Sequence, residues 1–180
     1  MRPPRTLPDL LRPGLEVVFV GINPGAVSAR RGHYYAHPGN GFWRALSASP
    51  LVSCELDPTA DRTLASRCGI GFTDVVKRVV TDSSQVTDAE LRAAVPAFRR
   101  RIAYARPRAV CFTTTRGLQA CFPGVRPASH WGQQPVSLEG AEVWVMPSTS
   151  GRAAAHRAHV HLVLAQLAER LRALRENIGP

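Results

Sequence analysis

The sequence has little negative charge and almost no lysine. Aspartate and glutamate number 13 against 23 basic residues, of which Lys77 is the single lysine, and the formal net charge is +10. Apolar runs are only a few residues long, too short to cross a bilayer. The first fourteen residues are interrupted by prolines and lack the apolar core of a signal peptide. We therefore expect a cytoplasmic protein that makes no membrane contact.

Metal-binding and disulfide patterns are also missing. The four cysteines, at positions 54, 68, 111 and 121, include no C-x-x-C pair, which predicts reduced, mostly buried thiols. His156 and His159 would share one face of a helix, with His161 nearby, but no cysteine or carboxylate lies close enough in sequence to complete a metal shell. We interpret all three as ordinary helix residues and expect no metal.

Common nucleotide-binding and hydrolase motifs are absent as well. The sequence contains neither G-x-G-x-x-G nor G-x-x-x-x-G-K-[ST], the loops that bind dinucleotides and phosphates. It also lacks the nucleophile elbow G-x-S-x-G. Ser148 and Ser150 lie in the segment PSTSG, which does not match that motif. These absences argue against a small-molecule nucleotide enzyme and against a serine hydrolase.

The positive charge lies almost entirely in the second half of the chain. Residues 1–90 contain ten basic and nine acidic residues, whereas residues 91–180 contain thirteen and four. A basic half-domain suggests a polyanionic partner, since each phosphate that is neutralised releases condensed counterions. The alternative is a solvated surface on a basic protein without such a partner.

Short apolar segments alternate with helical patterns along the chain. Buried strands are predicted over 16–21, 108–112 and 142–146, and residues 69–76 form an extended segment that turns into a loop holding Asp74. Helices are predicted over 40–46, 59–67, 87–104 and 154–176. The alternation predicts one α/β domain over residues 1–180, with an extended arm over 1–14. Its architecture would be a three-layer α/β/α sandwich around a mostly parallel sheet.

Polar and aromatic residues follow two of these strands, at the sheet edge where ligands bind. Asn23 offers an amide that can orient a water, and an aromatic ring in the next loop can stack on a planar base. The hydroxyls of residues 148–150 suit phosphate oxygens, and Arg152 could reach into a duplex. Each residue alone is more often structural, but their joint placement favours a functional site.

Two of these segments carry a resemblance to a known family. Residues 18–25 (VFVGINPG) and 32–43 (GHYYAHPGNGFW) resemble the first motif of the mismatch-specific uracil/thymine DNA glycosylases. Residues 146–152 (MPSTSGR) resemble the second motif, in the serine-rich form of the thymine branch, and residues 68–76 (CGIGFTDVV) are also similar. The similarity spans about residues 8–175 and implies a uracil-DNA glycosylase-like fold.

The resemblance implies an activity and a role for each matching residue. Such enzymes flip mispaired uracil or thymine out of duplex DNA and hydrolyse the N-glycosidic bond without cofactor or metal. Asn23 would position the water, although its amide cannot act as a base at neutral pH. The implied base-binding residues are Ile22, through its backbone, Tyr35, through stacking, and Asn40. The implied DNA-binding residues are Ser148, Thr149, Ser150, Gly151 and Arg152, of which Arg152 would fill the vacated stack.

The chain departs from the family pattern at two positions. Gly151 replaces the usual Ala or Leu beside the wedge, which would weaken contacts to the widowed guanine. Asp74 stands where many relatives have Asn or Lys, and a carboxylate there could activate water. The alternative role for Asp74 is a helix or turn cap.

We therefore expect a monofunctional DNA glycosylase that acts as a monomer on G:U or G:T mismatches in double-stranded DNA. Single-stranded DNA that contains uracil is a further candidate substrate. The competing hypothesis is a mismatch- or abasic-site-binding protein without turnover. Release of uracil from a G:U duplex separates the two.

Overall fold

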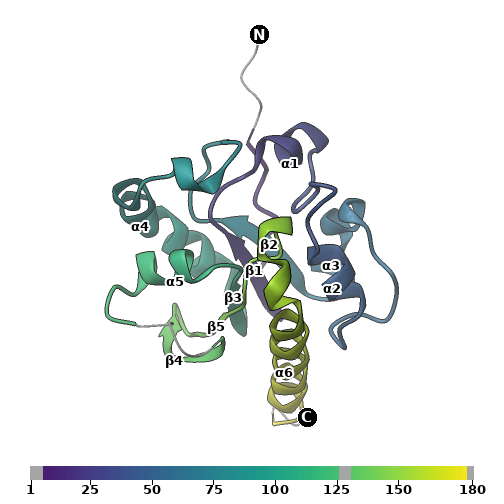
Figure 1. Cartoon of the computed structure of the whole chain (residues 1–180). Helices are drawn as coiled ribbons and strands as arrows, with labels where there is room; N and C mark the ends of the chain where they lie inside the picture. The colour runs from purple at the N-terminus through teal and green to yellow at the C-terminus, as the bar shows by residue number, and fades with distance from the viewer. Residues whose placement is uncertain (1–5, 126–130, 178–180) are drawn as a thin grey trace.

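A five-stranded sheet forms the centre of the protein. The computed structural model describes residues 6–125 and 131–177. Its strands are β1 (Val17–Gly21), β2 (Ile70–Asp74), β3 (Ala109–Phe112), β4 (Gly132–Leu138) and β5 (Ala141–Val145), in the spatial order β2-β1-β3-β5-β4 (Figure 1). All neighbouring pairs are parallel except β4 and β5. The sheet is therefore mostly parallel, with one antiparallel edge strand.

The register of the sheet brings the ends of four strands to one edge. Every residue of β1, β2 and β3 is buried, as expected of strands covered on both faces. Gly21 at the end of β1 pairs with Asp74 at the end of β2, and Phe112 at the end of β3 pairs with Val145 at the end of β5. The segments that leave these strands begin side by side.

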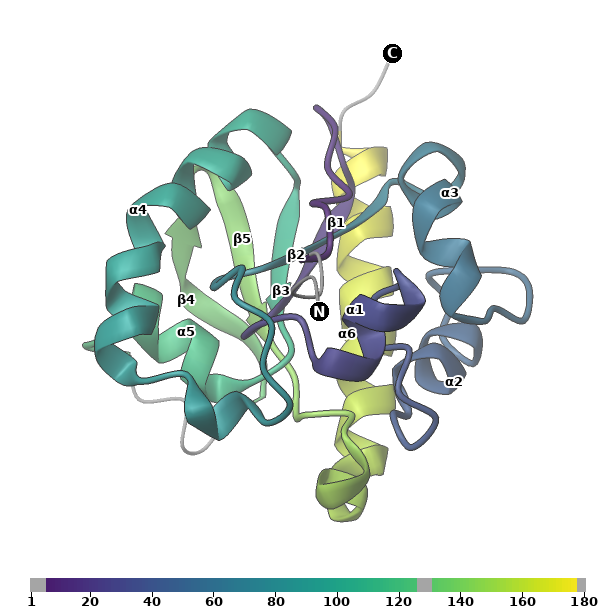
Figure 2. The same ribbon diagram turned by 90° about the horizontal axis from the view of Figure 1, so that it is seen from above.

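Helices cover both faces of the sheet, as Figure 2 shows. One side carries α4 (Asp88–Ala105) and α5 (Thr115–Cys121). The other side carries α1 (Ala26–Arg31), α2 (Phe42–Ser47), α3 (Asp61–Arg67) and α6 (Arg157–Glu176). Short 3-10 helices are η1 (Pro58–Ala60), η2 (Ser83–Gln85) and η4 (Gly151–His156). The predicted three-layer α/β/α sandwich is confirmed.

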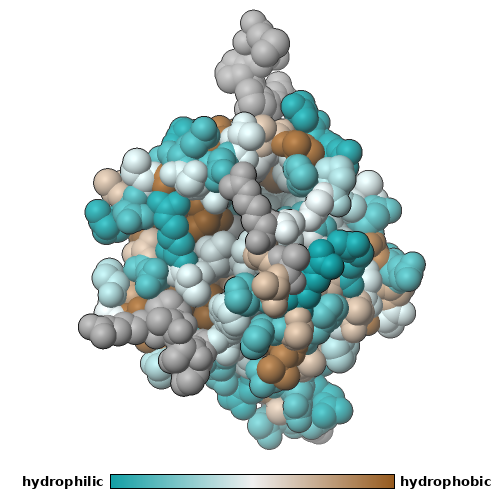
Figure 3. All heavy atoms as spheres, viewed as in Figure 1, coloured by the Kyte–Doolittle hydropathy of each residue, from teal (hydrophilic) through white to brown (hydrophobic). Residues whose placement is uncertain are grey.

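Two apolar clusters hold the layers together, one on each face of the sheet. On one face, Phe19 and Phe72 of the sheet pack with Phe42 of α2. On the other face, Val18 and Phe112 of the sheet pack with the buried apolar residues of α4. On the molecular face in Figure 3, hydrophobic residues appear only as small separate groups among hydrophilic ones. Among the described residues, no helix combines the length and apolar character needed to span a membrane.

The predicted elements agree with the structure where local patterns were strong. Thr87 caps α4 by accepting a hydrogen bond from the Glu90 N–H, and α4 continues through Pro96. Residues 69–76 differ from expectation, because Asp74 is the last residue of a strand rather than part of a loop. Three further elements, α1, α5 and β4, were not predicted from the sequence. The first helix has no side-chain cap, and β4 has a polar sequence, GQQPVSL.

Candidate active site

A cleft of about 610 Å³ lies at the carboxyl edge of the sheet. It is lined by the turn after β1, by Asp74 at the end of β2, by Thr113 and Thr114 after β3, and by Ser150 and Gly151 after β5. Strands from distant parts of the sequence thus contribute side chains to one cavity. This is the position in which open parallel sheets bind their ligands.

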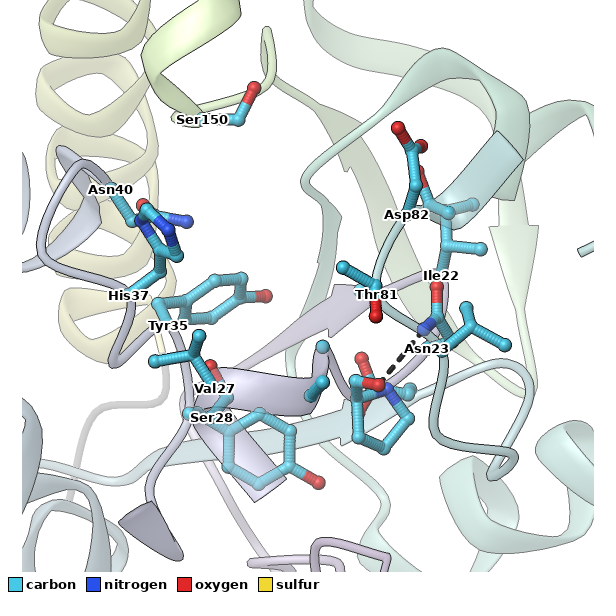
Figure 4. Close-up of a pocket in the computed structure, with 18 of the residues that line it drawn as sticks. Ile22, Asn23, Val27, Ser28, Tyr35, His37, Asn40, Thr81, Asp82 and Ser150 are labelled. Carbon is cyan, nitrogen blue, oxygen red and sulfur yellow. Dashed lines mark hydrogen bonds between the residues drawn. The ribbon is translucent and has the colours of Figure 1, made fainter. Parts of the chain in front are cut away.

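Asn23 lies in the tight turn that leaves β1. Its amide Nδ2 donates a hydrogen bond to the Pro24 carbonyl at 2.9 Å, which fixes the side chain (Figure 4). The turn is also held from outside, because Ala26 N donates to Val80 O at 3.2 Å. Asn23 lines the cleft, and its Oδ1 accepts no hydrogen bond from the described residues. An oriented amide oxygen of this kind can accept a hydrogen bond from water.

Tyr35 projects into the cleft from the opposite wall in Figure 4. Its backbone has a φ of +52°, an uncommon conformation for a bulky residue, and its ring stacks on Phe42 with centroids 4.2 Å apart. The hydroxyl group is buried and forms no hydrogen bond of normal geometry, although Thr113 lies near enough to act on it and lower its pKa. Burial and the nearby Asp74 raise the pKa of Tyr35, so the hydroxyl stays protonated at neutral pH. The cleft therefore contains a fixed aromatic ring with an unused donor.

Asn40 joins the two sequence motifs. Its Oδ1 accepts hydrogen bonds from Phe42 N at 2.9 Å and from Thr149 Oγ1 at 2.7 Å, while Gly41 N donates to Thr149 O at 2.8 Å. The first of these bonds holds the chain directly before α2, whose N-cap residue is Gly41. Asn40 also lines the cleft, so one side chain orders the turn after β5 and borders the candidate base site.

Asp74 is the most unusual polar residue of the cleft. The residue is 3% exposed, and its Oδ2 is buried without a partner. Gly21 permits this position, because a Cβ at residue 21 would overlap Asp74 Oδ1. A carboxylate that caps a helix or a turn accepts a hydrogen bond from a backbone N–H. The Asp74 carboxylate accepts none from the described residues, so it does not act as such a cap. A buried, unpaired carboxylate inside a cleft is a candidate for chemistry.

The surroundings of Asp74 set its acidity. Burial raises its pKa to about 7, the positive charge of Lys77 opposes this rise, Asp9 adds to it, and Arg101 again opposes it. Arg101 also holds the backbone in place, because one of its Nη atoms donates to Asp74 O at 2.6 Å. With a pKa near neutrality, the carboxylate can take up a proton at physiological pH.

The N-terminal arm supplies a residue that the sequence analysis missed. Asp9 accepts hydrogen bonds from Thr73 Oγ1 at 2.6 Å and from Lys77 Nζ at 2.9 Å, and its other carboxylate oxygen lies 3.4 Å from Arg101 Nε. The arm reaches this place because Leu10 pairs with Phe72 of β2. Asp9 thus pairs with the two cations that lower the pKa of Asp74, and its own negative charge raises that pKa.

The serine-rich turn after β5 is divided between two cavities. Ser150 and Gly151 line the cleft, whereas Ser148, Thr149 and Ser150 line a neighbouring pocket. Ser148 Oγ donates to Ser150 Oγ at 3.1 Å and accepts from Ser150 N at 3.2 Å, which shapes the turn. Arg152 follows in η4, and its side chain lies outside the described part of the structure.

Cleft residues that sequence reasoning missed come from two further segments. Thr113 and Thr114 follow β3, and the polar run TTT directly after a buried strand could have indicated them. Thr81 and Asp82 border the cleft beside Asn23 in Figure 4. Nothing in their local sequence indicates this, because their loop is placed by the contact of Val80 with the turn after β1.

The cysteines and histidines have ordinary environments. Cys111 and Cys121 are buried, but Cys68 is only partly buried and Cys54 is exposed, so the expectation of mostly buried thiols holds for half of them. His156 and His159 each pack against the Trp131 ring at 4.8 Å. Within residues 6–125 and 131–177, no group of three or more His, Cys, Asp or Glu side chains could hold a metal ion.

The fold and the site together define an α/β domain whose cleft contains a fixed aromatic ring and several polar side chains. The chain belongs to the uracil DNA glycosylase superfamily, whose sequence model matches residues 8–175. Members of this superfamily are hydrolases that act on N-glycosyl bonds. A similar fold occurs in the solution NMR structure of a candidate uracil DNA glycosylase from Methanosarcina acetivorans. That chain is 24% identical, with a TM-score of 0.57 and coverage of 91% of this chain and 98% of that one.

Proposed function

We propose that the protein is a monofunctional, mismatch-specific DNA glycosylase that removes uracil, and also thymine, from mispairs with guanine in duplex DNA. The observation that carries the proposal is the buried, unpartnered carboxylate of Asp74, in the same cleft as Asn23. The two residues come from neighbouring strands. Asp74 ends β2 and pairs with Gly21 at the end of β1, and Asn23 follows Gly21 by two residues. One group can take up a proton and the other can orient a water molecule.

The two groups suggest how the glycosidic bond is hydrolysed. Asn23 Oδ1 accepts a hydrogen bond from the water, whose oxygen attacks C1′ of the flipped nucleotide. The water proton passes to the ionised Asp74 carboxylate, and the bonding electron pair of C1′–N1 leaves with the base as an anion. Asp74 therefore supplies the base function that an asparagine amide cannot.

The remaining cleft residues would bind the flipped base and its strand. The Tyr35 ring is fixed by Phe42 on one side, so its other face can stack on a pyrimidine. The backbone at Ile22 and the side chain of Asn40 would contact the base edge, because both residues line the cleft. Ser148, Thr149, Ser150, Gly151 and Arg152 would contact the DNA backbone and the vacated stack.

Single-turnover release of uracil from a G:U duplex, detected by alkaline cleavage at the abasic site, tests the proposal. We expect release by the wild type and a loss of at least about 10²-fold in Asp74→Asn, a usual contribution of a general base. The matched control is Asp88→Asn, the same change at a side chain that is 70% exposed on α4, and it should retain the activity. A G:T duplex in the same assay tests whether thymine is accepted.

Tight binding of a G:U or abasic duplex with no release of uracil would contradict the proposal. That result would favour the competing hypothesis of a mismatch- or abasic-site-binding protein. Full activity of Asp74→Asn would instead remove Asp74 from the mechanism and leave Asn23 as the polar catalyst.

A further inference from the structure

A second pocket, of about 250 Å³, adjoins the active-site cleft. It is formed by α2, by the turn after β5 and by the start of α6, and it shares Ser150 with the cleft. Its polar lining consists of the hydroxyl groups of the turn and three basic side chains, Arg44, Arg157 and His161. None of the described residues that line it is acidic.

The two arginines of this pocket form no ion pair with the residues that the structure describes, unlike many arginines elsewhere. Arg116 pairs with Asp88 at 2.8 Å and Arg170 pairs with Glu142 at 2.6 Å, and similar pairs involve Arg78, Arg99, Arg101, Arg108 and Arg175. Among the described residues, neither Arg44 nor Arg157 has an acidic or hydrogen-bonding partner, and both are exposed. Figure 3 shows hydrophilic residues gathered beside the start of α6 on this face.

The position of the pocket relative to the cleft is fixed by hydrogen bonds. Thr149 Oγ1 donates to Asn40 Oδ1 at 2.7 Å, and Gly41 N donates to Thr149 O at 2.8 Å. Asn40 lines the cleft, while Gly41 and Thr149 line the second pocket. A strand with its base in the cleft would therefore pass over the turn and bring a neighbouring phosphate to the two arginines.

We propose that this pocket binds a backbone phosphate of the DNA strand whose base occupies the cleft. Arg44 and Arg157 would supply charge-assisted hydrogen bonds to the phosphate oxygens, and the turn hydroxyls would complete its coordination. Arginine suits this role because its planar guanidinium matches two phosphate oxygens at once. The inference rests on the proposed function, since it takes DNA as the ligand.

Duplex binding as a function of salt concentration tests the pocket. Arg44→Ala and Arg157→Ala should each weaken binding of a G:U duplex and reduce the slope of log K against log salt by about 0.9. The advantage of the wild type over either variant should then shrink about 3.5-fold between 50 and 200 mM salt, a factor that follows from that slope. The matched control is Arg172→Ala, on the same helix about 22 Å farther along, which is also exposed and lacks a described ion pair. Its binding should equal that of the wild type.

A neutral methylphosphonate moved along the uracil strand identifies the contacted phosphate. At one position the methylphosphonate should weaken binding by the wild type. At that position it should not weaken binding by Arg44→Ala or Arg157→Ala any further, because these variants have already lost the contact. Unchanged affinity and slope in both arginine variants would overturn the proposal, as would fully additive losses at every position. Stabilisation of the wild type alone by inorganic phosphate, with equal duplex binding, would instead indicate a small-anion site.

These measurements read binding rather than base release. A wild type that binds duplex through the pocket but releases no uracil would refute the glycosylase function and support the phosphate site. A wild type that releases uracil while both arginine variants bind DNA normally would support the glycosylase function and refute the phosphate site.

Discussion

The buried carboxylate of Asp74 predicts that Asp74→Asn makes the protein more stable as well as less active. In the folded protein its pKa is about 7, against 3.8 for an ordinary aspartate. Between these values the folded protein keeps the proton, whereas the unfolded chain has released it. The stability of the wild type therefore falls as the pH rises through this range, relative to a variant whose neutral amide does not titrate.

The size of the effect follows from the two pKa values. Each pH unit between them changes the difference in unfolding free energy by about 1.4 kcal/mol. With pKa values of 3.8 and about 7, the stability advantage of Asp74→Asn should grow by about 3 kcal/mol between pH 5 and pH 8.5. Above pH 8 the folded carboxyl group is fully ionised, so the difference should become constant.

Urea unfolding followed by tryptophan fluorescence at the two pH values measures this difference, provided that both proteins show the same m-value. The excision rate of the wild type should rise with pH and level off above the pKa of about 7, because the ionised carboxylate is the active form. Asp74→Asn should lack this rise. An equal stability difference at pH 5 and pH 8.5 would refute the reasoning, since it would mean that folding does not change the acidity of Asp74.

The sequence predicts those parts of the site that depend on local chemistry. The segment GINPG after a buried strand requires a turn, and the turn places Asn23 in the cleft. Residues 148–151 follow another strand of the same sheet, so their approach to the cleft follows from parallel topology. Positions at the cleft that need only a turn and a strand end therefore follow from the sequence, whereas the roles of these residues stay predictions.

Contacts between distant segments could not be predicted in the same way. Asp9 influences Asp74 because the N-terminal arm pairs with β2, and no local pattern specifies that pairing. The charge asymmetry along the chain is also partly cancelled in space, because Arg101 and Arg108 pair with Asp9 and Glu16 of the first half. The basic character of the second half is therefore weaker on the surface than in the sequence.

The other substitutions in the cleft separate binding from chemistry and from stability. Asn23→Ala should reduce single-turnover excision by at least about 10²-fold with little change in duplex binding, because the oriented water matters mainly in the transition state. Retained activity would mean that another group holds the water. Arg152→Ala should weaken excision from a G:U duplex more than from single-stranded uracil DNA, where no vacated stack has to be filled. Equal losses on both substrates would mean that Arg152 contributes only positive charge and does not fill the vacated stack. Tyr35→Phe keeps the ring that stacks on Phe42 and removes a hydroxyl that is buried without a partner. Because an unsatisfied buried hydroxyl destabilises a fold by about 1–3 kcal/mol, thermal or urea unfolding should show a more stable variant. Tyr35→Ala should instead lose both the packing and the base-stacking surface. A loss of stability in Tyr35→Phe would show that the hydroxyl makes a stabilising hydrogen bond, for example with Thr113 or with water.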